Sequence, residues 1–313
     1  MTAVICGSLA YDTIMVFPDQ FKRHILADQI HILNVSFLVP QMRREYGGVA
    51  GNIAFNLKLL GGEPLPLGCV GRDFGPYRQW LIGHGIRLDY VRELDEYFTA
   101  QAFITTDQDD NQITAFHPGA MDQSSSVDVR KVQGAKLGII APDSREGMLA
   151  HAAGFVEAGV PFIFDPGQAM PLFSGAEFRT FLDQADWVCV NSYEGKMLEE
   201  RTGMDTDEIR KRVKAYVVTH GAHGSEIFLP EDSIRIPAVD PGKVTDPTGC
   251  GDAFRAGIMF GLMNDLPWQT SGRIASLLGS IKVAFAGTQN HEFTRAEFAS
   301  RFKRHFGYAY DDS

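Results

Sequence analysis

The sequence predicts an α/β fold in which helices flank a mostly parallel, doubly wound sheet that carries a small β-sheet lid. From residue 137 onward, strand-like apolar segments alternate regularly with helical patterns, which is typical of a parallel sheet. Two extended segments also come before the first strong helix, where an α/β chain should pass directly from strand to helix. The 313 residues suffice for one such domain. We therefore expect a single domain over 1–313, with a lid insertion at about 13–46 and further lid strands within about 95–117.

The N-terminal elements follow from apolar runs and glycines. Residues 2–7 form a β-branched apolar run that predicts a buried strand, and the segments 14–17 and 30–39 are the extended pieces of the lid. A helix at 53–60 is bounded by glycines at both ends. The next predicted elements, some of whose strands join the lid, are a strand at 64–70, a helix at 76–83 and short strands at 88–94, 99–106 and 112–116.

In the C-terminal half, predicted strands and helices alternate more regularly. Its predicted strands are 137–141, 161–165 and 187–191, followed by a strand and glycine turn at 216–224 that lead into 225–229. Its predicted helices are 146–158, 175–182, one that opens at Asn191, 253–263, 267–285 and 294–306.

The net charge and the positions of the cysteines exclude several classes of partner and indicate the cellular compartment. The net charge of −10 argues against nucleic acid or an anionic membrane as a main partner. Cys6, Cys69 and Cys189 lie inside apolar runs, which is typical of buried strand cysteines in a reducing compartment. With neither a membrane-length apolar stretch nor a signal-peptide pattern, we expect a cytoplasmic protein. The P-loop and protein-kinase motifs are also lacking.

The segment 246–254, DPTGCGDAF, is the most suggestive of chemistry. Pro247 and two glycines make a tight turn before a helical pattern, so backbone N–H groups should point outward at the positive end of the helix dipole. Such a turn binds anions, phosphate above all. A carboxylate there repels an anion, but Asp252 makes sense if it takes a proton from a hydroxyl that attacks phosphate. In isolation, Asp252 also fits an ordinary first-turn acid.

Other polar groups and glycines lie at predicted strand ends. Asp12 follows the first strand, at the edge where open α/β sheets bind ligands, although a turn Asp would sit there too. Asn191 and Glu194 share a face at a helix start, where they can hold a metal's water shell, form a capping box, or do both. Glycine turns at 47–51 and 221–224 let a ligand approach the backbone, but tight packing and a hairpin also explain them.

The segment 246–254 closely resembles the C-terminal motif of the ribokinase-like (PfkB) superfamily of sugar and nucleoside kinases. The glycine turn, the N-x-x-E pair and the second glycine turn follow in the superfamily's order, and the likeness extends from residue 1 to about residue 290. It implies a doubly wound domain with a β lid, and transfer of the γ-phosphate of ATP to a hydroxymethyl oxygen with Mg²⁺. It also implies a monovalent cation such as K⁺ as an activator, bound near Asp246 and Thr248.

The resemblance gives each matching position a role. Asp252 would be the general base, beside a backbone anion hole at Gly249, Cys250 and Gly251. Mg²⁺ and the phosphates would be held by Asn191 and Glu194. The residues along ATP would be Asn191, Thr219, Gly221, Gly224 and Thr248. The hydroxyls of the substrate would be held by Asp12, Gly47, Gly48 and Asn52, where the Asp12 carboxylate suits a ribose diol.

Several stretches look like the bacterial adenosine kinases in particular, including 35–39, 47–54 and 287–289. In that group the nucleoside pocket would be lined by Ser8, Phe116 and Gln168, with Phe116 and Phe37 as stacking faces for a purine. The lid, with Ser36 and Phe37, would form the contact of a homodimer.

Two residues beside the proposed base need their own interpretation. Arg255 lies three residues after Asp252 on the same helix face, where it could reach a transferring phosphate or simply be ion-paired. Cys250 stands where an alanine or another small residue is usual, and a thiol at a helix N-terminus tends toward a lower pKa. We interpret Cys250 as a tolerated small residue.

Three hypotheses for the function follow. The first is an ATP- and Mg²⁺-dependent kinase that phosphorylates the 5′-hydroxyl of adenosine. The second keeps the chemistry and takes a sugar such as ribose or fructose, for which Phe116 and an apolar lid would have less use. The third is a non-catalytic ligand-binding protein on a kinase fold, against which the intact Asp252 and its glycines argue.

Overall fold

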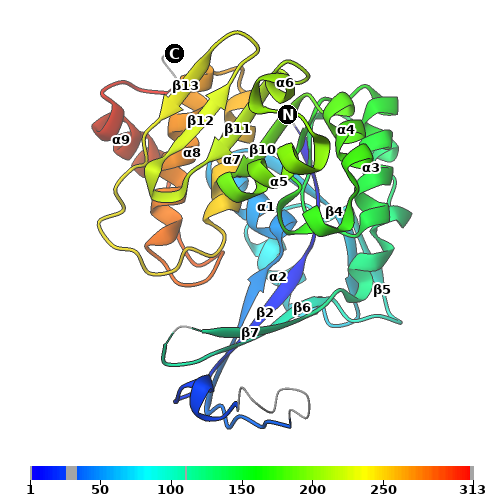
Figure 1. Ribbon diagram of the computed structural model, residues 1–313, viewed down its shortest axis with the longest axis vertical. Helices are drawn as coiled ribbons and strands as arrows, with labels where there is room; N and C mark the ends of the chain where they lie inside the picture. Colours follow the sequence, from blue (N-terminus) through cyan, green and yellow to red (C-terminus); the bar gives the residue numbers. More distant parts are fainter. Residues whose placement is uncertain (1, 26–33, 110, 311–313) are drawn as a thin grey trace.

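The computed structural model describes residues 2–25, 34–109 and 111–310, which form a large sheet and a small one (Figure 1). The large sheet has the strand order β13-β12-β11-β10-β9-β8-β1-β4-β5. Its strands from β11 to β5 pair in parallel, while β12 and β13 are antiparallel at one edge. The predicted doubly wound, mostly parallel α/β fold is therefore confirmed. The strands are β1 (Thr2–Cys6), β4 (Glu63–Gly71), β5 (Tyr90–Leu94), β8 (Ala135–Ile140), β9 (Phe162–Phe164), β10 (Trp187–Asn191), β11 (Ala215–Thr219), β12 (Ser225–Phe228) and β13 (Ser233–Ile236).

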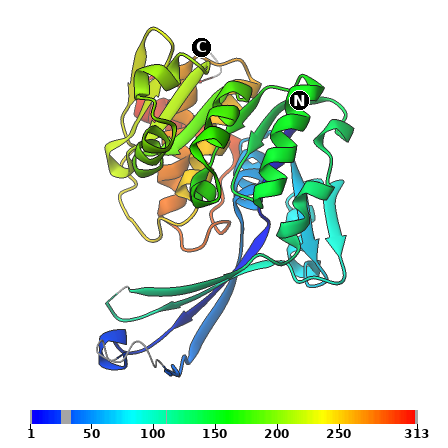
Figure 2. The same ribbon diagram turned by 45° about the vertical axis from the view of Figure 1, so that its right-hand side comes forward.

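Helices cover both faces of the large sheet (Figures 1 and 2). Alternate residues of a strand point to opposite faces, and β1 follows this rule. Ala3 and Ile5 belong to the hydrophobic cluster that includes residues of α1, α7 and α8, whereas Val4 and Cys6 belong to the cluster that includes residues of α3, α4 and α5. The helices are α1 (Val49–Leu59), α2 (Gly75–Gly83), α3 (Arg145–Ala158), α4 (Gly175–Gln184), α5 (Ser192–Thr202), α6 (Thr206–Arg210), α7 (Cys250–Met263), α8 (Trp268–Val283) and α9 (Arg295–Phe306).

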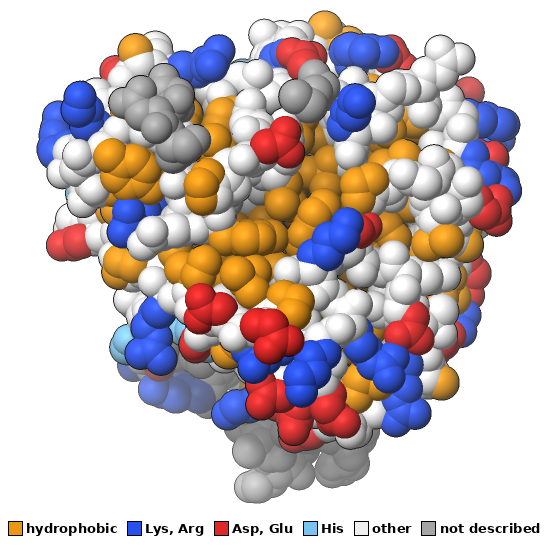
Figure 3. All heavy atoms as spheres, turned by 90° about the horizontal axis from the view of Figure 1, so that it is seen from above, with side chains coloured by type: hydrophobic (Ala, Val, Ile, Leu, Met, Phe, Trp, Pro, Cys, Tyr) orange, Lys and Arg blue, Asp and Glu red, His pale blue; other side chains and the backbone are white. Residues whose placement is uncertain are grey.

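The molecular surface opposite the small sheet mixes apolar and charged side chains. Figure 3 shows apolar side chains gathered at the centre of this face, with both acidic and basic side chains around them. Among the residues that the structure describes, no helix combines the length and apolar character needed to cross a membrane.

The small sheet, called the lid below, has the strand order β3-β2-β6-β7 and projects away from the large sheet (Figures 1 and 2). Its strands are β2 (Ala10–Val16), β3 (Gln41–Gly47), β6 (Ala100–Thr106) and β7 (Gln112–His117).

Two expectations about the lid strands need correction. The segment expected to be extended at 30–39 is not the second lid strand: residues 30–33 lie outside the described residues, and 34–40 form no strand. The strand is β3, which reads QMRREYG and is mostly exposed, so no apolar alternation marks it. Asp12, expected just past the first strand, lies inside β2.

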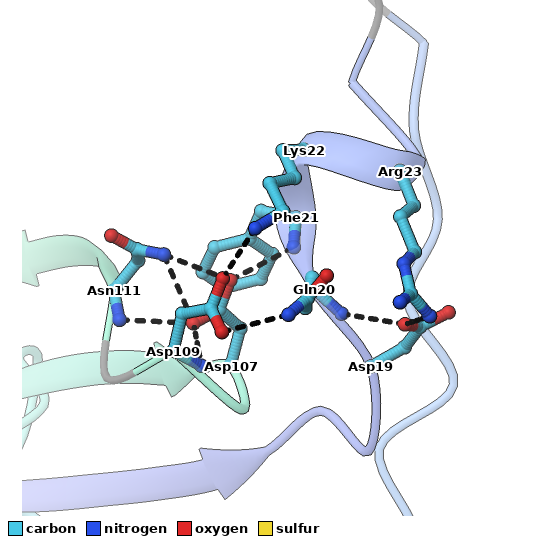
Figure 4. Close-up of polar contacts among 8 residues, drawn as sticks. All are labelled: Asp19, Gln20, Phe21, Lys22, Arg23, Asp107, Asp109 and Asn111. Atoms are coloured by element: carbon cyan, nitrogen blue, oxygen red, sulfur yellow. Dashed lines mark hydrogen bonds and ion pairs between the residues drawn. The ribbon is translucent and has the colours of Figure 1, made fainter.

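The distal end of the lid is held by one buried carboxylate (Figure 4). Asp107 accepts hydrogen bonds from the backbone amides of Phe21, Asp109 and Asn111, each at 2.9 Å. Phe21 comes from the 3₁₀ turn η1 (Phe21–Arg23) after β2, whereas the other two belong to the β6–β7 turn. Asp107 therefore links two connections of the lid that are distant in sequence.

Candidate active site

The turn before α7 presents backbone amides outward. Gly249 is the N-cap and has a φ of 77°. The positive φ favours glycine, and a Cβ on Gly249 would lie in a tight contact, 3.1 Å from the Thr288 side chain. The amides of Gly251 and Asp252 lie in the first turn, where an α-helix has no carbonyl acceptor for them. This is the geometry of an anion site at the positive end of a helix.

The Asp252 carboxylate is held by a side chain 200 positions away. Asn52 of α1 donates from Nδ2 to Asp252 Oδ2 at 2.8 Å. Gln289 donates to Asn52 Oδ1 at 3.0 Å, and the Trp80 indole donates to Gln289 Oε1 at 3.0 Å. This chain of hydrogen bonds fixes the Asn52 amide with its nitrogen toward the carboxylate. Burial raises the pKa of Asp252, and the hydrogen bond from Asn52 opposes that shift.

Aromatic rings connect this chain of hydrogen bonds to the last residues of β3, the lid strand that leads into α1. Gln289 Nε2 also donates to the Tyr77 hydroxyl at 2.6 Å, and Tyr77 donates to the Gly47 carbonyl at 2.8 Å. Tyr46 of β3 stacks on Tyr77 and on Trp80, with ring centroids 4.7 and 5.4 Å apart. The last residues of β3 therefore contact the same group that orients Asn52.

Asp12 brings a second carboxylate to the site. Burial raises the pKa of Asp12 to about 6, and the negative charges of Asp252 and Glu45 add to the shift. A Cβ on Gly47 would lie 2.5 Å from Asp12 Oδ2, so the glycine leaves room for the carboxylate. Gly48 is the N-cap of α1, with a φ of 82°. The glycine turn thus starts α1 and accommodates Asp12.

The lid register places Asp12 and Phe116 on one face. Asp12 pairs with Ala102, and Ala102 pairs with Phe116 on the next strand. Directly paired residues point to the same side of a sheet, and their neighbours point to the other. Phe116 therefore shares the face of Asp12, with a ring that is 52% exposed, whereas Phe103 lies on the opposite face. The lid sheet offers one aromatic side chain here.

Arg255 is buried and ion-paired. Its guanidinium donates from Nη2 to Asp165 Oδ1 at 2.6 Å and lies 3.7 Å from Glu194 Oε2. A Cβ on Gly251 would lie 2.7 Å from Arg255 Nη1, so the guanidinium lies against the first turn of α7. Of the two interpretations open from the sequence, the structure has the ion pair. Arg255 supplies positive charge beneath the turn.

Asn191 and Glu194 form the capping box at the start of α5. Asn191 Oδ1 accepts from the amides of Tyr193 and Glu194, and Glu194 Oε2 accepts from the Asn191 amide at 2.8 Å. No cluster of three or more metal-ligating side chains occurs among the described residues. Mg²⁺ normally keeps several waters and binds one or two carboxylates plus substrate phosphates. The single Glu194 carboxylate, with the nearby Asp252, fits that mode of binding.

Besides Asn191, which caps α5, the predicted ATP-contacting residues lie beside the end of β11 and in the turn before α7. Thr219 ends β11, and Gly221 follows with a φ of 57° and open space beside its Cα. Gly224 has a structural reason to be glycine, since a Cβ would lie 2.1 Å from the Ile236 carbonyl oxygen. Thr248 is exposed in the turn before α7. Gly221 and Thr248 thus remain open to a ligand, whereas Gly224 shapes the β12–β13 edge.

The predicted nucleoside-pocket residues do not all gather at the site. Ser8 follows β1, and its hydroxyl accepts from the Val49 amide at the start of α1, at 3.0 Å. Gln168 is exposed after β9, in the 3₁₀ turn η5 (Gly167–Leu172). Ser36 is also exposed, and Phe37 packs with Phe17, Phe21 and His24 at the distal end of the lid. Phe37 therefore belongs to a lid cluster in this conformation.

The position of Cys250 at a helix N-terminus would tend to lower the pKa of its thiol, but burial has the larger effect. Burial raises the pKa of the Cys250 thiol to about 11, and the nearby charge of Lys282 only partly opposes it. The thiol is therefore protonated at neutral pH. Cys6, Cys69 and Cys189 are buried, as predicted.

Comparisons with known proteins match most of the chain. The profile of the pfkB family of carbohydrate kinases covers residues 11–295. This chain belongs to the PfkB family. It is 30% identical to a nucleoside kinase of Methanocaldococcus jannaschii over 87% of this chain and 90% of that protein. It is 27% identical to the probable chloroplastic fructokinase-6 of Arabidopsis thaliana over 72% of this chain and 65% of that protein.

A solved structure supports the same placement within the PfkB family. The nucleoside kinase of Burkholderia thailandensis in complex with inosine has a TM-score of 0.90 and 48% identity, covering 98% of this chain and 99% of that one. The same protein has also been solved in complex with ADP-inosine.

Sequence reasoning missed the roles of two residues in this PfkB chain. The resemblance includes Gln289 only within the stretch 287–289, and the sequence predicts Lys282 only as part of the helix 267–285. The signal for Lys282 was a lone cation inside the apolar run SIKVAF. Gln289 carried no such signal, because its contacts with Asn52 and Tyr77 span more than 200 positions.

The buried ion pair gives a stability prediction. Arg255→Met leaves Asp165 buried without its partner, so the free energy of unfolding should fall by about 3–5 kcal/mol. The matched control is Arg235→Met, because the Arg235 side chain is 82% exposed and its loss should change stability by less than about 0.5 kcal/mol. Urea denaturation measures both. Equal losses in the two variants would contradict a stabilising buried pair.

Proposed function

We propose that the protein is an ATP- and Mg²⁺-dependent nucleoside kinase that transfers the γ-phosphate of ATP to the 5′-hydroxyl of adenosine, giving AMP and ADP. The observation that carries the proposal is the row Asp12–Ala102–Phe116 on one face of the lid. Asp12 and Phe116 lie two strand spacings apart, about 10 Å, which suits the span from a ribose diol to a purine. The carboxylate accepts the two ribose hydroxyls, and the ring stacks on the base.

Base selectivity should be broad within the purines. Because Phe103 lies on the other face, the lid sheet contributes a single stacking wall and leaves the base edge open. Stacking is tolerant of base identity, since every base has a π-face. The inosine bound to the Burkholderia thailandensis relative supports a purine nucleoside as acceptor. We therefore include inosine with adenosine as an expected substrate.

The residues of this chain divide the work of phosphoryl transfer. Asp252 takes the proton of the 5′-hydroxyl, and Asn52 holds that carboxylate in place. The amides at the start of α7 receive the transferring phosphoryl group, and the buried Arg255 adds positive charge beneath them. Thr219, Gly221 and Thr248 lie along ATP, and Asn191 and Glu194 face its phosphates. Mg²⁺ held near Glu194 would neutralise charge on the phosphates.

A sugar kinase is the second candidate, because the match to a plant fructokinase extends over most of this chain. Asp12 would bind the hydroxyls of a free sugar equally well. Phe116 separates the two candidates, since a sugar such as ribose or fructose has no aromatic base to stack on its exposed ring.

We also propose that the protein forms a homodimer through the lid. The lid face opposite Asp12 carries Met42, Phe103 and Ile113, which are 69%, 41% and 44% exposed. Exposed apolar side chains grouped in this way typically mark an interaction surface. A second copy of the same sheet would cover this face.

The first prediction tests the reaction and the base together. ADP release with ATP and Mg²⁺ should be far faster with adenosine or inosine than with ribose or fructose. In Asp252→Asn, kcat should fall by about 10²- to 10⁴-fold, because the general base is lost while the shape is kept. A coupled ADP assay measures the rates, and calorimetry with ADP tests that the variant still binds nucleotide. Equal turnover in Asp252→Asn would reject the base, and turnover on free sugars alone would favour the sugar kinase.

The second prediction tests the purine-stacking face. Phe116→Ala should raise the KM for adenosine roughly 5- to 150-fold, since stacking on one aromatic contributes about 1–3 kcal/mol. The matched control is Phe103→Ala, which removes the same ring from the opposite face and, assayed at a concentration where it sediments as a dimer, should leave KM unchanged. Steady-state kinetics decides. An equal rise in both variants would show that the effect comes from the lid sheet in general.

The third prediction tests the homodimer. Sedimentation equilibrium should give a dimer for the natural chain and a monomer for Met42→Glu, because a charge on the apolar face opposes its burial. Lys22→Glu, on the exposed side chain of η1, is the control and should remain dimeric. A natural chain that sediments as a monomer would contradict the proposal.

A further inference from the structure

Lys282 is a fully buried cation that no step of the proposed transfer uses. It lies in the last turn of α8 and is 0% exposed, although lysine is almost never fully buried without partners. Its ammonium donates to the backbone carbonyl oxygens of Asp246 at 2.7 Å and Phe285 at 3.4 Å. Burial lowers the pKa of Lys282, and the negative charge of Asp246 opposes that shift. A positive charge is also favoured at a helix C-terminus.

Asp246 joins three segments around this ammonium. Its carboxylate oxygens accept from the backbone amides of Thr248 and Gly287, each at 2.9 Å. Its own amide donates to the Val283 carbonyl at 3.1 Å. The loop before α7, the end of α8 and the loop after α8 therefore meet at Lys282.

The two loops carry the geometry of the active site. The loop before α7 ends at Gly249, whose amide-presenting turn packs on Thr288 of the other loop. The next residue, Gln289, orients Asn52 toward Asp252. A change in the spacing of these loops would move the anion-binding turn and the support of the base together. Lys282 is thus placed to position both without touching a substrate.

This junction does not fit the K⁺ ion that the resemblance implies. K⁺ sites in proteins are built from oxygen ligands such as backbone carbonyls. Here the carbonyls of Asp246 and Phe285 already accept from the Lys282 ammonium, and both carboxylate oxygens of Asp246 accept backbone amides. An ammonium group has the same charge as K⁺ and a closely similar size.

We propose that the Lys282 ammonium is a built-in monovalent cation that positions the active-site loops and makes the reaction independent of added K⁺. The rate measurements that test it rest on the proposed kinase function. A stability measurement that needs no activity accompanies them.

Two variants of Lys282 and a control variant separate the effect of its positive charge from the effect of its side-chain volume. The natural chain should have the same kcat in KCl as in tetramethylammonium chloride of equal ionic strength. Lys282→Ala and Lys282→Met should each lose about 100-fold in kcat, the size of effect that a small misplacement of catalytic groups produces. K⁺ or methylammonium should restore much of the rate to Lys282→Ala, which leaves space, and none to Lys282→Met. Lys214→Met, at an exposed ion pair, should behave like the natural chain.

Thermal melting gives the independent readout. KCl, but not tetramethylammonium chloride, should raise the Tm of Lys282→Ala, because an ion that binds only the folded state stabilises it. The Tm of the natural chain should be the same in both salts. Activation or stabilisation of the natural chain by K⁺ would overturn the proposal, and so would a full rate in Lys282→Met. If the natural chain phosphorylates no nucleoside or sugar, the proposed function fails and melting alone decides. If Lys282→Ala does not fold, the salt response of the natural chain decides.

Discussion

The hydrogen bond from Asn52 to Asp252 is the constraint on which the site depends. It joins α1 to α7, and it requires the Asn52 amide to present its nitrogen rather than its oxygen to a carboxylate. Gln289 enforces that orientation, and Trp80 in turn fixes Gln289. The start of α1, the turn before α7, the loop after α8 and the last residues of β3 must therefore fold together before the carboxylate has its partner.

Two cationic side chains are buried beside this site, although the chain as a whole is acidic. The net charge is −10, yet Arg255 and Lys282 are both buried beside the start of α7. Burying a charge is costly unless it is paired and hydrogen-bonded. Arg255 is compensated by two carboxylates, whereas Lys282 is compensated by backbone carbonyls and Asp246. The two cations thus offset part of the negative charge that Asp165, Glu194 and Asp246 gather near the start of α7.

The sequence was sufficient for the inner strands of the large sheet, because these strands are apolar on both faces. It also located the turn at Asp252 and the capping box at Asn191. It missed the edge strand β13, SIRI, whose residues are partly polar and exposed. It failed for β3, a polar strand that is exposed on most of its length. The ion pair of Arg255 and the contacts of Gln289 depend on tertiary neighbours, which no local pattern encodes.

The stack of Trp80 on Tyr46 has an optical consequence. Trp80 belongs to α2, whereas Tyr46 belongs to β3, so the pair spans the junction between the main domain and the lid. The other two tryptophans, Trp187 and Trp268, lie in β10 and α8, away from this junction. Indole fluorescence is sensitive to the ring's neighbours and to the hydrogen bond of its N–H. Emission from Trp80 should therefore report on the packing of Tyr46 and the hydrogen bond to Gln289 at this junction, without an attached dye.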